Sequence, residues 1–479
     1  MQRLKQLGKD SLIYGLGSIA AKSIGLVVLP IYTRIFTPAE YGTIEMLGLT
    51  ASLLSAFLVM GMDSAQSFYF FEQKKNGKES QATVVSAILQ WRVSWGIGIV
   101  LLATVSSPLI NAWLFRGELT WQFFALAFGA SLFNCVMGQS VQIFRLLYRP
   151  WPFITITLTQ TLLAAAIIIA LVLIFDRGII AFFIGSTVAS LFAACLGWYL
   201  ARDYIDFQKL HVAWWPRLLR FGLPLVPAGL AMYGMNASGR WFLQYYHGPE
   251  DLGIYAIGAR FSLLFALVVE TFRRAWWPIA MDSMHSDDGP ATFRMIARLY
   301  VGVGVAAIII LTLVAPWLVQ WLTGPRFHSA WPIIGILCWQ SLFYGLFLAA
   351  SAGMFKTEKT YINAYLMAAA AVLNIWLNTL LVPHYEGIGA AFATAATFLV
   401  WITASILISE RLWKVGHRLS VFAAQVAVGA AVVAWLTFER GEYDLVTQCT
   451  IAILSASLLL VFSLDRDGRR QLLGVLRSK

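Results

Sequence analysis

Charged side chains are scarce in this sequence. Asp, Glu, Lys and Arg together make up 12% of its 479 residues, whereas soluble globular domains carry about 25%. Hydrophobic residues make up 59% of the chain. A soluble chain of this length would divide into two or more domains, and this composition does not supply the polar surface that such domains need. The scarcity of charge therefore excludes a soluble protein and indicates that lipid is the solvent for most of the chain.

Motifs for enzyme chemistry are also lacking. The chain has no GxxxxGK[ST] phosphate-binding loop, so we expect no ATP hydrolysis. Its six His residues are scattered and form no HExxH motif, and no Ser-His-Asp arrangement is recognisable by spacing. We therefore expect no catalytic residue, no metal and no cofactor. The cysteines lie far apart in apolar runs, where a thiol behaves as a small hydrophobic group; they are Cys135, Cys195, Cys338 and Cys449.

Apolar runs that are long enough to cross a bilayer recur along the whole chain. A transmembrane helix needs about 20 apolar residues, and a helix satisfies its own backbone hydrogen bonds in lipid. The sequence therefore predicts an all-α polytopic membrane protein with about 14 transmembrane helices. The predicted spans are 11–33, 42–70, 82–110, 121–147, 152–175, 178–201, 217–243, 252–281, 293–321, 330–354, 360–382, 387–409, 419–438 and 444–463.

The distribution of basic residues predicts the orientation. Cytoplasmic loops carry an excess of Lys and Arg. If the N-terminus is cytoplasmic, most of the 35 Lys and Arg residues fall in inside loops, for example at 72–80 and 355–359, and in the tail that follows the last span. We expect both termini to face the cytoplasm. The net charge of +11 then reflects topology and attraction to anionic lipid, and no nucleic-acid partner is needed to explain it.

Two pairs of passages reveal an internal duplication. The residues FTPAEYG at 36–42 match HGPEDLG at 247–253, and DRGIIAFF at 176–183 matches YEGIGAAF at 385–392. Each passage has the same place in its half. The predicted halves, 1–210 and 211–410, contain six helices each, and an even number makes them parallel repeats around a central cavity. Residues 411–479 supply two additional transmembrane helices and a basic cytoplasmic tail.

The passage RIFTPAEYGTIEMLGL at 34–49 resembles the signature region of polysaccharide transporters in the multidrug/oligosaccharidyl-lipid/polysaccharide exporter superfamily. The resemblance implies a flippase in the bacterial plasma (inner) membrane. Such proteins move undecaprenyl-diphosphate-linked oligosaccharide repeat units to the outer leaflet for O-antigen, capsule or exopolysaccharide synthesis. Expected partners are this lipid-linked substrate, membrane lipids, and the polymerase and chain-length proteins of the same pathway.

Cationic side chains within the predicted spans are the candidates for substrate binding. A charge at mid-bilayer costs about 2.5–3.5 kcal/mol on insertion scales, so it should face a partner or a wet cavity. Fixed cations would stabilise a diphosphate there through charge-assisted hydrogen bonds. Most of these residues lie in the first, second, seventh and eighth spans, which line the cavity in the family that the chain resembles. The candidates are Lys22, Arg92, Arg240, Arg260 and Arg273.

Four of these cations also have a structural interpretation. Lys22 can form an ion pair with Asp63 or Glu45, Arg92 can pair with a neighbouring helix, and Arg240 can extend its head group to the interface. Arg273, together with Arg274, can pair with Glu270 at helical spacing and anchor the helix at the membrane surface.

Acidic and proline residues complete the candidate set. Glu45, Asp63 and Glu270 are candidates for coupling transport to an H⁺ or Na⁺ gradient, although such carboxylates also serve as plain counter-ions. Proline removes a backbone hydrogen bond and kinks a helix. A hinge is therefore a possible role, beside an ordinary packing kink, for three prolines at equivalent helices of the two halves: Pro30, Pro224 and Pro227.

Other functions fit parts of this pattern. A flippase for the peptidoglycan lipid precursor would also favour a cationic cavity. A cation-coupled multidrug exporter of the same superfamily should instead carry more acidic than basic residues in its spans. A scaffold subunit of a polymer-export complex is a further alternative. A glycosyltransferase or polymerase is disfavoured, because the predicted outside loops are too short to carry a catalytic centre.

Overall fold

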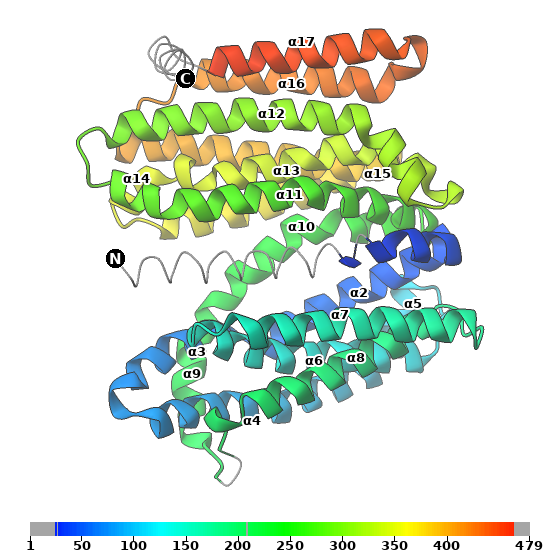
Figure 1. Ribbon diagram of the computed structural model, residues 1–479, viewed down its shortest axis with the longest axis vertical. Helices are drawn as coiled ribbons and strands as arrows, with labels where there is room; N and C mark the ends of the chain where they lie inside the picture. The colour runs from blue at the N-terminus through cyan, green and yellow to red at the C-terminus, as the bar shows by residue number, and fades with distance from the viewer. Residues whose placement is uncertain (1–23, 26, 207–208, 464–479) are drawn as a thin grey trace. The chain divides into compact units, whose positions relative to one another are not determined.

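The computed structural model describes residues 24–25, 27–206 and 209–463, which are helical almost throughout (Figure 1). No strand occurs among these residues. The chain divides into two compact units, residues 1–233 and 234–479. The division falls within one helix, α10 (Val226–Tyr246), which belongs in part to each unit.

The first unit contains one described helical stretch before α2, at 27–35. Its remaining helices are α2 (Pro38–Val59), α3 (Met62–Glu72), α4 (Lys78–Val105), α5 (Ser107–Leu114), α6 (Trp121–Leu146), α7 (Pro150–Leu173), α8 (Ile180–Leu200) and α9 (Trp215–Gly222). Helices α6, α7 and α8 pack against one another, and α4 and α2 pack on α6. The core of this unit therefore lies around α6.

The second unit contains the rest of α10 and seven further helices. These are α11 (Pro249–Ser283), α12 (Gly289–Leu322), α13 (Trp331–Ala350), α14 (Ala352–Lys356), α15 (Tyr361–Leu412), α16 (Leu419–Phe438) and α17 (Leu445–Ser463). Helix α13 packs against α11, α12 and α15. Helices α16 and α17 lie along α12, as Figure 1 shows.

The prediction of an all-α polytopic membrane protein is confirmed. In the described part of the chain, twelve helices are long and apolar enough to cross a membrane. One of them, α15, has 52 residues and is interrupted at Glu386, where φ is 50° and ψ is −134°. It therefore provides two of the predicted spans, 360–382 and 387–409. The first predicted span, 11–33, lies largely outside the described residues.

Two predicted spans are broken in the structure. The span at 42–70 divides into α2 and α3, because Met60 and Gly61 both adopt left-handed backbone conformations, with φ of 46° and 72°. The span at 217–243 divides into α9 and α10, which are joined by the 3₁₀ turn Leu223–Leu225. These breaks are invisible to an analysis of apolar runs, because hydropathy continues unchanged across them.

The two breaks lie against each other within the first unit. A Cβ atom on Gly61 would stand 2.3 Å from the carbonyl oxygen of Gly222, and a Cβ atom on Gly222 would stand 2.4 Å from the carbonyl oxygen of Met60. Both distances are far shorter than van der Waals contact allows. Glycine is therefore required on both sides, so that the backbones can approach at the point where each span changes direction.

We expect Gly222→Ala to destabilise the protein by about 1–3 kcal/mol, the usual cost of forcing extra atoms into a packed site. The matched control is Gly229→Ala in α10, where a Cβ atom would meet nothing within 4 Å. Thermal unfolding of the detergent-purified proteins measures both effects. Equal melting temperatures for the two variants would contradict this account of the contact.

Candidate functional site

Arg92 and Asp63 form an ion pair between α4 and α3. The Arg92 side chain is 1% exposed and Asp63 is 50% exposed. The Nη2 atom of Arg92 bonds Asp63 Oδ1, and its Nη1 donates to the carbonyl oxygen of Cys135 at 2.6 Å. One residue of the pair, Arg92, is therefore buried, and the other, Asp63, is half exposed. Asp63 lies in the first turn of α3, where the helix dipole also favours a negative charge.

Arg273, Arg274 and Glu270 form a second charged cluster, on α11. Glu270 accepts from Arg273 Nη1 at 2.9 Å and from Arg274 Nε at 3.0 Å. The guanidinium of Arg273 also lies 4.3 Å from the centre of the Tyr344 ring, on α13. The helical pairing that the sequence made available is thus present. All three charged side chains are 30% exposed or more, so their net contribution to stability is small.

The other predicted charges are placed on separate elements. Arg240, on α10, is partly buried, and its guanidinium lies 5.8 Å from the ring centre of buried Tyr255 on α11. Arg260, on α11, is exposed, and Glu45, on α2, is partly buried. Lys22 lies outside the described residues. The binding and coupling roles of all these residues stay predictions.

The three predicted hinge residues occupy different local structures. Pro30 lies in the helical stretch at 27–35. Pro224 is the central residue of the 3₁₀ turn between α9 and α10, and Pro227 is the second residue of α10. Proline is tolerated in the first turn of a helix, because its missing N–H has no partner there in any case. Pro224 and Pro227 therefore mark a junction of two helices, and the hinge role stays a prediction.

A buried network of uncharged polar groups was missed by the sequence analysis. Asn374 and Asn378, on α15, are both 0% exposed. Asn374 donates to Thr397 Oγ1 at 3.0 Å and accepts from Asn378 Nδ2 at 3.0 Å. Ser238 Oγ, on α10, bonds Asn374 Oδ1. The network ties α10 to both parts of α15. The network contains no ionisable group. Two Asn residues four positions apart in an apolar run would nevertheless have indicated a buried polar contact on one face of the helix.

The first unit has a similar network. Gln160, on α7, donates to Asn134 on α6 and, at 3.1 Å, to Ser190 on α8. Interhelical hydrogen bonds of this kind hold helices together in lipid, where burial of apolar surface gives no net drive between helices. Each unit thus has its own network of interhelical hydrogen bonds. These networks help to determine which helices of a unit are neighbours.

We expect Asp63→Asn to destabilise the protein by about 3 kcal/mol, at the lower end for breaking a buried ion pair. This change leaves the charge of Arg92 buried without its counter-charge. Arg92→Met should cost less, because Asp63 is half exposed and can remain hydrated. Thermal unfolding in detergent measures the loss of stability in each variant and shows which is larger.

Glu72→Gln is the control, because its ion pair with Arg217 is exposed on both sides. It should change stability by less than about 1 kcal/mol. If Arg92→Met were as costly as Asp63→Asn, the asymmetric burial of the pair would not govern its energetics.

Solved structures with the same fold are transport proteins. A structure of the lipid II flippase MurJ in an inward closed conformation matches with a TM-score of 0.69 and 13% identity, and the match covers 94% of this chain and 98% of MurJ. An inward-facing multidrug resistance MATE family transporter of the MOP superfamily matches with a TM-score of 0.60 and 12% identity, over 84% of this chain and 95% of that one. At such identities the likeness shows the fold alone.

Sequence relatives occur in Haemophilus influenzae. "Lsg locus putative protein 1" is 22% identical over 285 residues, which is 58% of this chain and 66% of the relative. An uncharacterized membrane protein of the same organism is 21% identical over 281 residues, again 58% of this chain and 65% of the relative. The matches thus span slightly less than two thirds of each relative's own length.

The profile of one protein family matches residues 7–284 of this chain, which is more than half of its length. The matched region contains the passage at 34–49 and continues through α11 into the second unit. The chain therefore belongs to the polysaccharide biosynthesis protein family.

Proposed function

We propose that this protein is a flippase that moves undecaprenyl-diphosphate-linked oligosaccharide repeat units from the cytoplasmic to the outer leaflet of the bacterial inner membrane. The observation that carries the proposal is the family match over residues 7–284. The transporter fold supports it, and so does the excess of basic over acidic residues within the predicted spans. The products served would be O-antigen, capsule or exopolysaccharide, and a pathway polymerase would receive the translocated units.

In this proposal, cations within the spans receive the diphosphate. The headgroup brings roughly two negative charges, and leaving water would cost several kcal/mol per charge without compensation. Arg240 and Arg260 are the described cations that are best suited to the role, with Lys22 from the first span. Arg240 lies on α10 and Arg260 lies on α11. Arg in particular can bind phosphate oxygens through two parallel hydrogen bonds.

In this proposal, Asp63 couples transport to an H⁺ or Na⁺ gradient. Its carboxylate is half exposed while Arg92 behind it is buried. A proton or Na⁺ that reached Asp63 would compete with Arg92 for the same oxygens and weaken the contact between α3 and α4. An ion gradient could thus bias two arrangements of these helices, which is what alternating access between two sides of the membrane requires. Both termini would face the cytoplasm.

A flippase for the peptidoglycan lipid precursor is the second candidate. The likeness to the lipid II flippase, with a TM-score of 0.69, favours it over a multidrug exporter. The two flippases bind the same polyprenyl diphosphate and differ in the sugar that they accept. An assay that identifies the trapped lipid separates them.

The decisive experiment uses a strain that lacks the gene. Lipid-linked sugars are extracted, and an enzyme that acts only from outside the cell reports their leaflet. We expect complete repeat units to be trapped on the inner leaflet and to be released by the native gene. Trapped peptidoglycan precursor would replace the first proposal by the second, and normal exposure of both lipids on the outer leaflet would overturn both.

The same strain tests Arg260. We expect Arg260→Ala to lower export at least tenfold at normal protein abundance, because one charge-assisted phosphate contact is worth about 1.5–3 kcal/mol. Arg116→Ala is the matched control, since Arg116 is an exposed arginine in the loop between α5 and α6. Unchanged export with Arg260→Ala would remove this residue from the binding set.

A further inference from the structure

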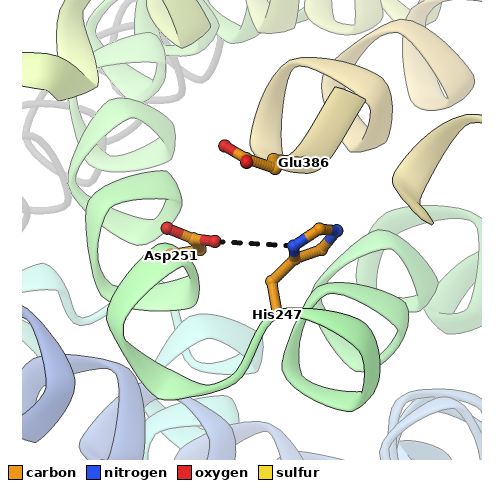
Figure 2. Close-up of side chains that lie close together, drawn as sticks. All are labelled: His247, Asp251 and Glu386. Carbon is orange, nitrogen blue, oxygen red and sulfur yellow. Dashed lines mark ion pairs between the residues drawn. The ribbon is translucent and has the colours of Figure 1, made fainter. Parts of the chain in front are cut away.

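Three side chains from two distant parts of the sequence converge at one point in the second unit. They are His247, directly after α10, Asp251, in the first turn of α11, and Glu386, at the interruption of α15 (Figure 2). Each offers one atom that can bind a metal ion, and these atoms all lie within 4.8 Å of one another. His247 and Asp251 are partly buried, and Glu386 is exposed.

The hydrogen bond of His247 fixes which ring nitrogen is available. Its Nε2 lies 2.9 Å from the carbonyl oxygen of Val382. A carbonyl oxygen only accepts hydrogen bonds, so Nε2 carries the proton. In the neutral ring, Nδ1 is then left with a lone pair, and it faces Asp251 Oδ2 at 3.8 Å. Histidines that bind metals are oriented in this way, with one nitrogen donating to a carbonyl and the other directed at the ion.

The two carboxylates are close together and have no Lys or Arg partner among the described residues. Among the described residues, neither Asp251 nor Glu386 forms an ion pair with Lys or Arg. The basic residue that lies next to Asp251 is His247. Two like charges at this separation repel each other in a partly buried place. A bound divalent cation would turn that repulsion into attraction.

The internal repeat shows that Asp251 does not have the capping role of its counterpart in the first half. In the first copy, Glu40 occupies the position of Asp251, and it closes a capping box in which its carboxylate accepts from Thr37 N at 2.8 Å. In the second copy, the N-cap residue of α11 is Gly248, and no side chain caps the helix. Asp251 is therefore free of the task that its counterpart performs.

Glu386 also differs from its counterpart in the first half of the chain. The matched passages place Arg177 of the first half at the position of Glu386. The second half thus has two acids where the first half has an acid and a base. Glu386 also holds a left-handed φ of 50°, a conformation that is unfavourable for a residue other than glycine and that is often kept for function.

We propose that His247, Asp251 and Glu386 bind one divalent transition-metal ion, with Zn²⁺ as the best fit. One imidazole nitrogen and two carboxylate oxygens are ligands that Zn²⁺ accepts at about 2.0–2.2 Å, and three protein ligands leave a fourth position for water or another group. Mg²⁺ and Ca²⁺ prefer an all-oxygen shell. Ligands of one tetrahedral ion lie about 3.4 Å apart at these bond lengths, so exposed Glu386 would move inward on binding.

This site was not expected from the sequence, where the His residues appear scattered and no ligand spacing is visible. Its ligands are brought together only by the packing of α11 and α15. The bound ion would clamp the turn between α10 and α11 to the interruption of α15. The proposal concerns ion binding and is independent of which lipid the protein transports.

The test uses the full-length protein, purified in detergent through a tag without histidine and stripped with a chelator. After equilibration with ZnCl₂ and removal of free metal, bound zinc is measured by mass spectrometry and the melting temperature by thermal unfolding. We expect about one bound Zn²⁺ per chain and a higher melting temperature with zinc. Glu386→Gln and His247→Gln should weaken zinc binding at least tenfold.

Glu250→Gln is the matched control, because Glu250 is an exposed acid in the same turn and lies outside the cluster. It should bind zinc like the wild type. Glu386→Gln should melt like the wild type in the absence of zinc, which separates lost binding from lost folding. Wild-type protein that retains no more zinc than Glu386→Gln, or equal losses with Glu250→Gln, would overturn the proposal.

Discussion

Inside a bilayer, a polar group can be satisfied only by another part of the protein, and this constraint governs most of what the structure contains. It makes the chain helical, because helices satisfy their own backbone. It also explains why Arg92 meets Asp63 and the carbonyl oxygen of Cys135, and why Asn374, Asn378 and Ser238 bond one another. The polar residues within the spans are few, and they decide which helices are neighbours, since apolar faces alone do not distinguish one helix from another.

The same constraint explains how much of the fold could be predicted from the sequence. Long apolar runs identified the spans, because length and hydropathy are properties of each segment by itself. Loops, Pro and Gly placed their ends closely enough to separate 360–382 from 387–409, on either side of Glu386. The breaks at Gly61 and at Leu223–Leu225 were not predicted, because they depend on a contact between two segments about 160 residues apart in the chain.

The candidate site was less accessible to sequence reasoning for the same physical reason. Charges within spans could be found by inspection, and the pairing of Glu270 with Arg273 and Arg274 followed from helical spacing. The partner of Arg92 could not be fixed, because helix rotation is set by packing. The convergence of His247, Asp251 and Glu386 could not be seen at all, since one ligand comes from a part of the chain more than 130 residues beyond the other two. Neutral groups such as Asn374 were overlooked because only ionisable side chains were considered.

The Arg92–Asp63 pair also has a consequence for biosynthesis. Helix α3 leaves the ribosome before α4, so Asp63 has already been made when Arg92 emerges. Arg92 alone near the centre of a span would oppose lateral release of α4 into lipid, by about 2.5–3.5 kcal/mol on insertion scales. Release of α3 and α4 together as a hairpin would carry the two charges into the membrane as a neutral pair. The ion pair thus lowers the cost of inserting one helix when the helix before it is already present.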